Sequence, residues 1–176
     1  MLRSKLMSIV TLLAVIVIAF AAVVPAKAAP VAKNSIVDVA LAVNAQTGLF
    51  DTLVAALLAA DPAVIQTLSS KGQYTVFAPT DDAFAKLGLY ASNIGTLDKA
   101  ALTSILLYHV APGSRYAEDV VSSSRIRTLS KGFLTVIVNS NGAFVDGKSS
   151  NPSKIILTDV AASNGVIHVI DNVLLP

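Results

Sequence analysis

Residues 73–87, QYTVFAPTDDAFAKL, constrain the fold more than any other part of the chain. The alternation over residues 74–77 predicts a β-strand, and Pro79 ends it because proline fixes φ and has no backbone N–H for a strand ladder. Three residues of types that cap helices come next, namely Thr80, Asp81 and Asp82. They predict a helix over residues 83–87. A strand, a stop and a helix start therefore follow one another directly.

Residues 1–28 have the pattern of a secretory signal helix. Two basic residues precede an apolar segment, 6–24, and the small residues Ala26 and Ala28 follow Pro25 where a signal peptidase cleaves. The alternative is an uncleaved anchor, because the apolar segment approaches the roughly 20 residues that span a bilayer. We expect the protein to be secreted, and to be extracellular, periplasmic or at the cell surface. It would contact a membrane only through this N-terminal segment, and only if the segment is not cleaved. Residues 29–33 are expected to form a linker, and residues 34–176 a single domain.

The formal charge of +2 belongs to the N-terminal segment. Removing residues 1–28 takes away three of the thirteen Lys and Arg residues and leaves ten against eleven Asp and Glu. The densest basic run is Arg125-Ile126-Arg127, which suits a solvated strand face. Nucleic acid is therefore not expected as a partner. The chain has no cysteine, which excludes disulfides and thiolate metal sites.

Apolar residues at helical spacing predict three helices before residue 70, and a later helix that begins at Thr96 or Asp98. This later helix ends in Tyr108-His109. His109 falls below Leu102, Ile105 and Leu106 on the helical wheel, which predicts a core histidine hydrogen-bonded to the turn at Thr80, Asp81 and Asp82. Tyr108 is turned away by about 100°, which places its hydroxyl at the rim.

Beyond residue 113 the apolar period changes to that of short strands. The β-rich runs are 125–129, 133–138, 144–146, 154–158, 166–171 and 173–175. Asn141-Gly142 and Asn164-Gly165 predict hairpins with type I′ turns, whose two central residues have positive φ. His168 alternates with Val166 and Ile170 in one such run, which predicts a second core histidine. Helices first and strands later indicate the α+β class.

Three segments, YTVFAPTDDAF, LLYHV and NGVIHVIDNVLLP, resemble in this order and separation the signatures of the fasciclin-type domain family. The resemblance extends over about residues 34–176. It implies a wedge of two β-sheets with a helical cap, and a non-catalytic role in adhesion outside the cell.

The resemblance also implies two sites of contact with a partner. One is the Tyr-His motif, matched by Tyr108 and His109, of which we expect Tyr108 to make the contact. The other is an Asp-Ile pair, matched by Asp159 and Val160, which we expect between a strand and the following turn. Residues expected to be structural are Thr80, Asp81, Asp82, His109, Asn164, Gly165 and His168.

Motifs of catalysis are absent from the sequence. It has no nucleophile elbow, phosphate loop, HExxH, EF-hand loop or dinucleotide fingerprint, so we expect no enzyme, metal or cofactor. The expected function is adhesion or attachment to matrix or biofilm, through extracellular protein or polysaccharide. The alternative is a carrier of a small hydrophobic ligand such as a carotenoid, for which the chain offers aliphatic surface but no tryptophan. The sequence does not specify the oligomeric state.

Overall fold

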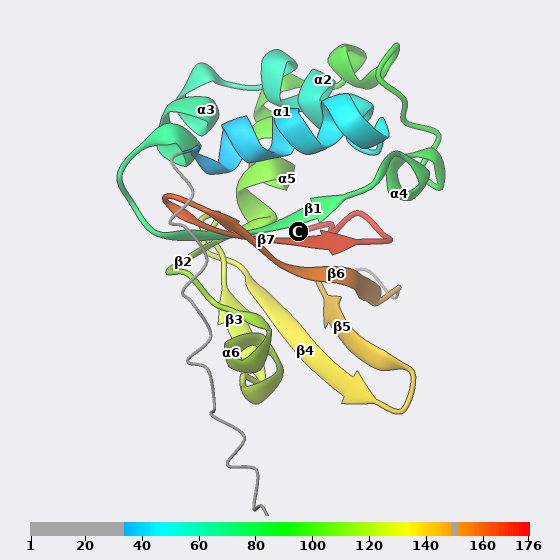
Figure 1. Ribbon diagram of the computed structural model, residues 1–176. Helices are drawn as coiled ribbons and strands as arrows, with labels where there is room; N and C mark the ends of the chain where they lie inside the picture. Colours follow the sequence, from blue (N-terminus) through cyan, green and yellow to red (C-terminus); the bar gives the residue numbers. More distant parts are fainter. Residues whose placement is uncertain (1–33, 149–150) are drawn as a thin grey trace, which may run out of the picture.

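The structure is a computed structural model that describes residues 34–148 and 151–176 (Figure 1). The expected signal helix, 1–28, and linker, 29–33, lie outside the described residues. Among those described, no single helix is both long and apolar enough to cross a bilayer. The one pair of helices that qualifies together, Asp51–Ala59 with Pro62–Ser69, is bent by 114°.

Helices make up most of the first half of this region. They are α1 (Ile36–Thr47), α2 (Asp51–Ala59), α3 (Pro62–Ser69), α4 (Asp81–Ala85), a 3₁₀ turn η1 (Ile94–Thr96), α5 (Lys99–Tyr108) and the short α6 (Ala117–Ser122). Their starts follow local chemistry. The side chains of Ser35, Asp61 and Asp98 accept hydrogen bonds from the first free amides of α1, α3 and α5. We did not predict α6, whose preceding residue, Tyr116, is not a type that signals a helix start.

Seven strands form one continuous mixed sheet. They are β1 (Tyr74–Pro79), β2 (Val110–Pro112), β3 (Arg125–Arg127), β4 (Phe133–Asn139), β5 (Gly142–Asp146), β6 (Ser153–Ala162) and β7 (Gly165–Ile170), in the order β2-β1-β7-β6-β5-β4-β3. Strand β6 joins two parts of this sheet, which we call arms. Its first residues pair with β5, in the arm β5-β4-β3, and its remaining length pairs with β7, in the arm β7-β1-β2. The α+β class is confirmed, and the two sheets of the expected wedge are these two arms.

The strand predictions need three corrections. Strand β2 was not predicted, and residues 173–175 are not a strand although Val173 and Leu174 are buried. Both Asn-Gly hairpins form, but their turns are not type I′. Asn139 pairs with Gly142 and Ala162 pairs with Gly165, so the two turns consist of residues 140–141 and 163–164. All four of these residues have negative φ. Each glycine instead follows its turn with positive φ.

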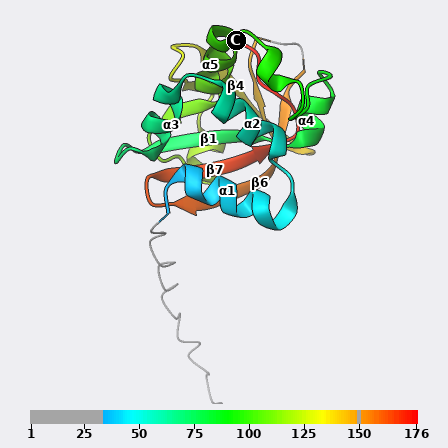
Figure 2. The same ribbon diagram turned by 90° about the horizontal axis from the view of Figure 1, so that it is seen from above.

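Two cores lie on opposite faces of the parallel pair β1–β7. Helices α1, α2, α3 and α5 cover one face, where Val76, Ile167 and Val169 pack against them (Figures 1 and 2). Phe77 and Ile170 point to the other core, which the arm formed by β3, β4 and β5 and helix α6 enclose. This burial on both faces explains why β1 and β7 read as nearly continuous apolar runs.

Candidate functional site

The three residues after β1 connect the helical cap to the sheet. The Thr80 hydroxyl accepts from the Ala83 amide at 3.3 Å and caps α4. The Asp81 carboxylate accepts from the amides of Asp51 and Thr52, at 3.1 and 2.7 Å. It thereby caps α2, although it lies about thirty residues further along the chain. Phe50, the residue before α2, cannot cap this helix because it has no side-chain oxygen. Asp82 is exposed. The two carboxylates therefore do not act on a common centre.

His109 is buried at the end of α5, with an exposed fraction of 3%. Its Nδ1 donates to the Ile105 carbonyl at 2.8 Å, and its Nε2 accepts from the Leu174 amide at 2.9 Å. Burial lowers the pKa of His109 to about 4, against the opposing effect of the hydrogen bond to Ile105. The prediction that the ring is hydrogen-bonded to the turn after β1 is wrong, because its two bonds go to Ile105 and to Leu174 in the C-terminal segment. Neither ring nitrogen remains free to act as a base.

The prediction that the Tyr108 hydroxyl lies at the rim is wrong. Tyr108 is 1% exposed and belongs to the core beneath β4 and β5. Its hydroxyl donates to the Phe133 carbonyl at 2.9 Å. A Cβ on Gly132 would collide with the ring, and a Cβ on Gly147 would collide with the Leu175 carbonyl and lie tightly against the ring. A partner therefore cannot reach Tyr108 in this structure, and burial raises the pKa of its hydroxyl, with a smaller effect from Asp146.

Asp159 and Val160 lie within β6 and not in a loop after a strand. The register of β6 against β7 shifts between Leu157 and Val160, so a bulge contains Asp159. Asp159 is exposed and has a φ of 61°, the left-handed region that non-glycine residues rarely adopt. Its Oδ1 accepts from the amide of Ala117, the first residue of α6, at 2.8 Å. Val160 is half-buried against the helix-side core, opposite Ile167.

His168 supports the bulge from inside the sheet. It is fully buried and stacks on Phe77, with ring centroids 5.7 Å apart. Its Nε2 donates to the Arg115 carbonyl at 2.8 Å, and its Nδ1 accepts from the Asp159 amide at 3.4 Å. Burial lowers the pKa of His168, opposed by the bond to Arg115 and the charge of Asp159. This link between His168 and Asp159 has no sequence signal, because it depends on the bulge.

Asn164 joins three elements at the start of β7. It is 5% exposed, and its Oδ1 accepts from the Ile36 amide at 2.8 Å. Its Nδ2 donates to the carbonyls of Leu68 and Ser70, at 2.6 and 2.8 Å. Gly165 follows with a φ of 155° and lies against the Tyr74 carbonyl, where a Cβ would collide. The Asn-Gly pair thus fixes α1, α3 and β1 relative to β7.

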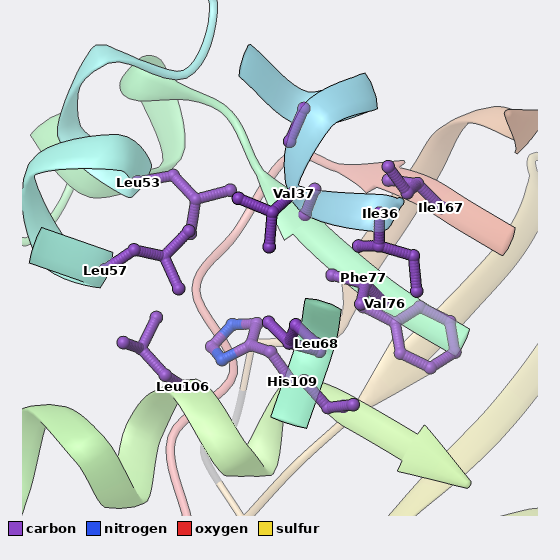
Figure 3. Close-up of a pocket in the computed structure, with 13 residues that line it drawn as sticks. Ile36, Val37, Leu53, Leu57, Leu68, Val76, Phe77, Leu106, His109 and Ile167 are labelled. Atoms are coloured by element: carbon purple, nitrogen blue, oxygen red, sulfur yellow. The ribbon is translucent and has the colours of Figure 1, made fainter. Parts of the chain in front are cut away.

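An apolar cavity of about 30 Å³ lies between the helices and β1 (Figure 3). Leu53, Leu57, Leu106 and Ile36 line it, and the His109 ring is its polar member. For scale, a cavity needs about 10 to 15 Å³ on this measure to hold one water molecule, and a dry cavity that binds benzene measures about 150 Å³. In the part of the chain that the structure describes, no group of three or more His, Cys, Asp or Glu could hold a metal ion.

These contacts define a class of protein, a helix-capped α+β domain whose polar motif residues mostly hold its elements together. The sequence matches the model of the fasciclin domain over residues 48–176. The chain belongs to the fasciclin domain family.

Individual relatives agree with this assignment. The chain is 47% identical to Protein sll1483 of Synechocystis sp. over 130 residues, which are 72% of this chain and 67% of that protein. It is 35% identical to the transforming growth factor-beta-induced protein ig-h3 of Sus scrofa over 127 residues, 72% of this chain but only 18% of that protein. A solved FAS1 domain pair from the insect cell adhesion molecule fasciclin I shares the fold. Its TM-score is 0.61 at 23% identity, over 73% of this chain and 46% of that one.

Proposed function

We propose that the protein is an exported, non-catalytic interaction domain that contributes to adhesion at the cell surface, in matrix or in biofilm. Membership of the fasciclin family supports the adhesive role, as does the fold shared with an insect cell adhesion molecule. The neutral, fully hydrogen-bonded states of His109 and His168 support a non-catalytic domain, since neither histidine has a free nitrogen for proton transfer.

The observation that carries the proposal is the presentation of Asp159. A backbone in a sparsely populated conformation persists only where its surroundings enforce it, and such positions cluster at functional sites. Here the His168 ring and the α6 amide of Ala117 hold Asp159, while its side chain stays exposed. Ile156 and Leu157 precede it in β6 and are each 52% exposed. We assign them the apolar contact that the sequence suggested for Val160.

A carboxylate held in this way suits a cationic group on an extracellular partner. An ordered acceptor loses little conformational entropy when it binds, and charge-assisted hydrogen bonds are roughly twice as strong as neutral ones. Val160 supports the bulge from the core side, and Tyr108 takes no part. The carrier alternative is not favoured. The apolar cavity of about 30 Å³ has no room for a carotenoid, and the larger hollow of about 570 Å³ beside Asp61, Asp98 and Lys99 is open to solvent and has charged and hydroxyl side chains in its lining.

The test is attachment of the producing cell to surfaces and to neighbouring cells. We expect deletion of the gene to reduce attachment and the wild-type gene to restore it. Asp159→Asn should fail to restore it, because it removes the charge yet keeps the Oδ1 acceptor and a residue type that tolerates positive φ. Asp82→Asn, at an exposed carboxylate beside the cap, is the matched control and should restore attachment fully.

Two results would contradict this function. One is unchanged attachment of the deletion strain on every surface tried. The other is equal restoration by the Asp159→Asn and Asp82→Asn genes at equal protein levels. Export is tested separately by N-terminal sequencing of the protein from the culture medium and cell envelope, where we expect the mature chain to begin at Ala29.

A further inference from the structure

In the part of the chain that the structure describes, no helix or strand covers one face of the arm formed by β3, β4 and β5 (Figure 1). Helix α6 covers the opposite face, where Val120 packs on Ile126 and Leu134. Because side chains alternate along a strand, the residues between these buried positions point away from the core that α6 covers. Arg125, Arg127, Phe133 and Thr135 on this side are all exposed.

The strand register arranges this open face in rows. Arg127 lies opposite Phe133, and Arg125 lies opposite Thr135. The next row runs from Ile137 through Phe144 to Lys154, across β4, β5 and β6. We call the set Arg125, Arg127, Phe133, Ile137, Phe144 and Lys154 the outer face.

Contacts on the outer face restrain its cations before any ligand binds. The Arg125 guanidinium carbon lies 4.5 Å from the centroid of the Phe133 ring, within the range of cation–π attraction. The Lys154 side chain runs across the hairpin, since its Cε would lie 3.4 Å from a Cβ placed on Gly142. Less side-chain entropy is therefore lost when these groups meet an anion.

The outer face combines positive charge with an apolar floor. Two arginines stand at one side and Lys154 at the other, about 14 Å away over three interstrand spacings. The half-buried side chains of Ile137 and Phe144 lie between them. Two carboxylates offset part of this charge. Asp146 is half-buried in the row of Arg125 and Thr135, and Asp171 accepts a hydrogen bond from the Lys154 amide at 2.8 Å. Three cations against these two carboxylates leave the face positive by one charge, although the chain without residues 1–28 is close to neutral.

We propose that the outer face binds an extended polysaccharide that carries carboxylates, such as a polymer of uronic acids. A sugar ring presents a flat C–H face to an apolar floor, and its carboxylates at intervals along the chain meet the forked donors of Arg125 and Arg127 and the Lys154 ammonium. This inference rests on the proposed adhesive function, because it names one class of partner for it. The outer face is a different surface from the one that presents Asp159.

Protection of a sheet edge accounts for only part of the outer face. Charges on an edge strand such as β3 discourage pairing with another sheet, but that purpose needs neither the ordering over Phe133 nor Lys154 on the far side. Three cations are few for a polyphosphate chain, whose binding relies on many neutralised charges. A peptide bound by its side chains needs pockets, and the floor here is an open strand surface.

The experiment measures binding of purified full-length protein to polygalacturonate by affinity electrophoresis, with neutral dextran as the comparison polymer. We expect retardation by polygalacturonate alone, weakening as salt rises. The double variant Arg125→Gln/Arg127→Gln should bind about tenfold more weakly or worse, and Lys154→Gln should weaken binding by a smaller factor. The matched control is Lys71→Gln/Lys99→Gln, which removes the same charge from exposed positions of the helical cap and should bind within about twofold of wild type.

Three results would overturn the proposal: no binding to polygalacturonate, equal weakening by the two double variants, or equally strong, Arg125-dependent binding to polyglutamate or to anionic vesicles. Failure here is distinguishable from failure of the adhesive function. A deletion strain that attaches poorly although the protein ignores polygalacturonate refutes only the polysaccharide. Normal attachment of the deletion strain together with Arg125-dependent binding refutes only the adhesive function.

Discussion

The Nε2 atom of His109 accepts a hydrogen bond of 2.9 Å from the backbone amide of Leu174. This bond joins the end of α5 to the C-terminal segment, and both residues are buried. Because the Nδ1 atom donates to Ile105 at the same time, the ring must be neutral with its proton on Nδ1. The histidine of the LLYHV segment therefore connects the end of α5 to the C-terminal segment within the core.

Replacing His109 by alanine should lower the free energy of unfolding by about 2 to 4 kcal/mol, since it opens a cavity and leaves the buried Leu174 amide without a partner. Urea denaturation of the wild type and His109→Ala measures the difference. The control is Ser104→Ala, on the exposed side of the same helix, which should change stability by less than about 0.5 kcal/mol. An alanine variant as stable as the wild type but unable to bind a partner would show that His109 acts in recognition.

The stability of the domain should fall as pH decreases from about 6.5 to 4. The folded-state pKa of His109 is depressed from 6.5 to about 4, so the unfolded chain binds its proton first. The contribution of the neutral ring is complete above pH 6.5 and is lost as pH falls through this window. Its full size is roughly 3 kcal/mol. His168 adds to the same trend, because its pKa is also lowered.

Urea denaturation at intervals from pH 7.5 to 4 measures this slope. His109→Gln cannot titrate and should show a shallower decline than the wild type, with the remainder due to His168 and to carboxylates near the lower limit. Identical slopes in the two proteins would contradict the assignment of a neutral buried His109.

Asp81 and Asp82 should differ sharply although they are adjacent and identical in type. Asp81→Ala leaves the first amides of α2 without an acceptor and should cost about 1 to 2 kcal/mol. Asp82→Ala removes only an exposed charge at the first turn of α4, and should cost less than about 1 kcal/mol. Chemical denaturation of both variants provides the comparison. Equal losses would mean that Asp81 acts only through the dipole of its own helix.

This pair also shows where prediction from sequence succeeds and where it ends. A cap by Thr80 on its own helix is a contact between neighbours, so composition and spacing reveal it. The cap by Asp81 on α2 crosses thirty residues, and nothing local to Phe50 announces that its helix needs a distant acceptor. Local chemistry predicted most helix starts and both Asn-Gly hairpins, because these depend on a few consecutive residues.

The candidate site was less predictable for the same reason. Helical spacing correctly separated Tyr108 from the stripe of His109, but it could not show that a second core lies on that other side. The bulge at Asp159 arises where β6 places two residues, Thr158 and Asp159, opposite a single residue of β7, between the pairs Leu157–Val169 and Val160–Ile167. Strand pairing of this kind depends on contacts far apart in sequence, so the exposure of Asp159 and its contact with His168 became visible only in the structure.

Gly165 should tolerate substitution far less well than Gly48, although both have positive φ. Gly48 follows α1 with a φ of 64° and has no atom within 4 Å of a built Cβ, so Gly48→Ala should cost only about 1 kcal/mol of backbone strain. At Gly165 a Cβ would overlap the Tyr74 carbonyl, and relief requires movement of β1 away from β7. That movement would disturb the bond from the Tyr74 amide to the Asn164 carbonyl and the contacts of the Asn164 side chain.

We therefore expect Gly165→Ala to lose on the order of 3 kcal/mol or more of unfolding free energy, or not to fold. Urea denaturation and the yield of folded protein measure the contrast, and similar losses at the two glycines would refute the close approach of β1 and β7 at this turn.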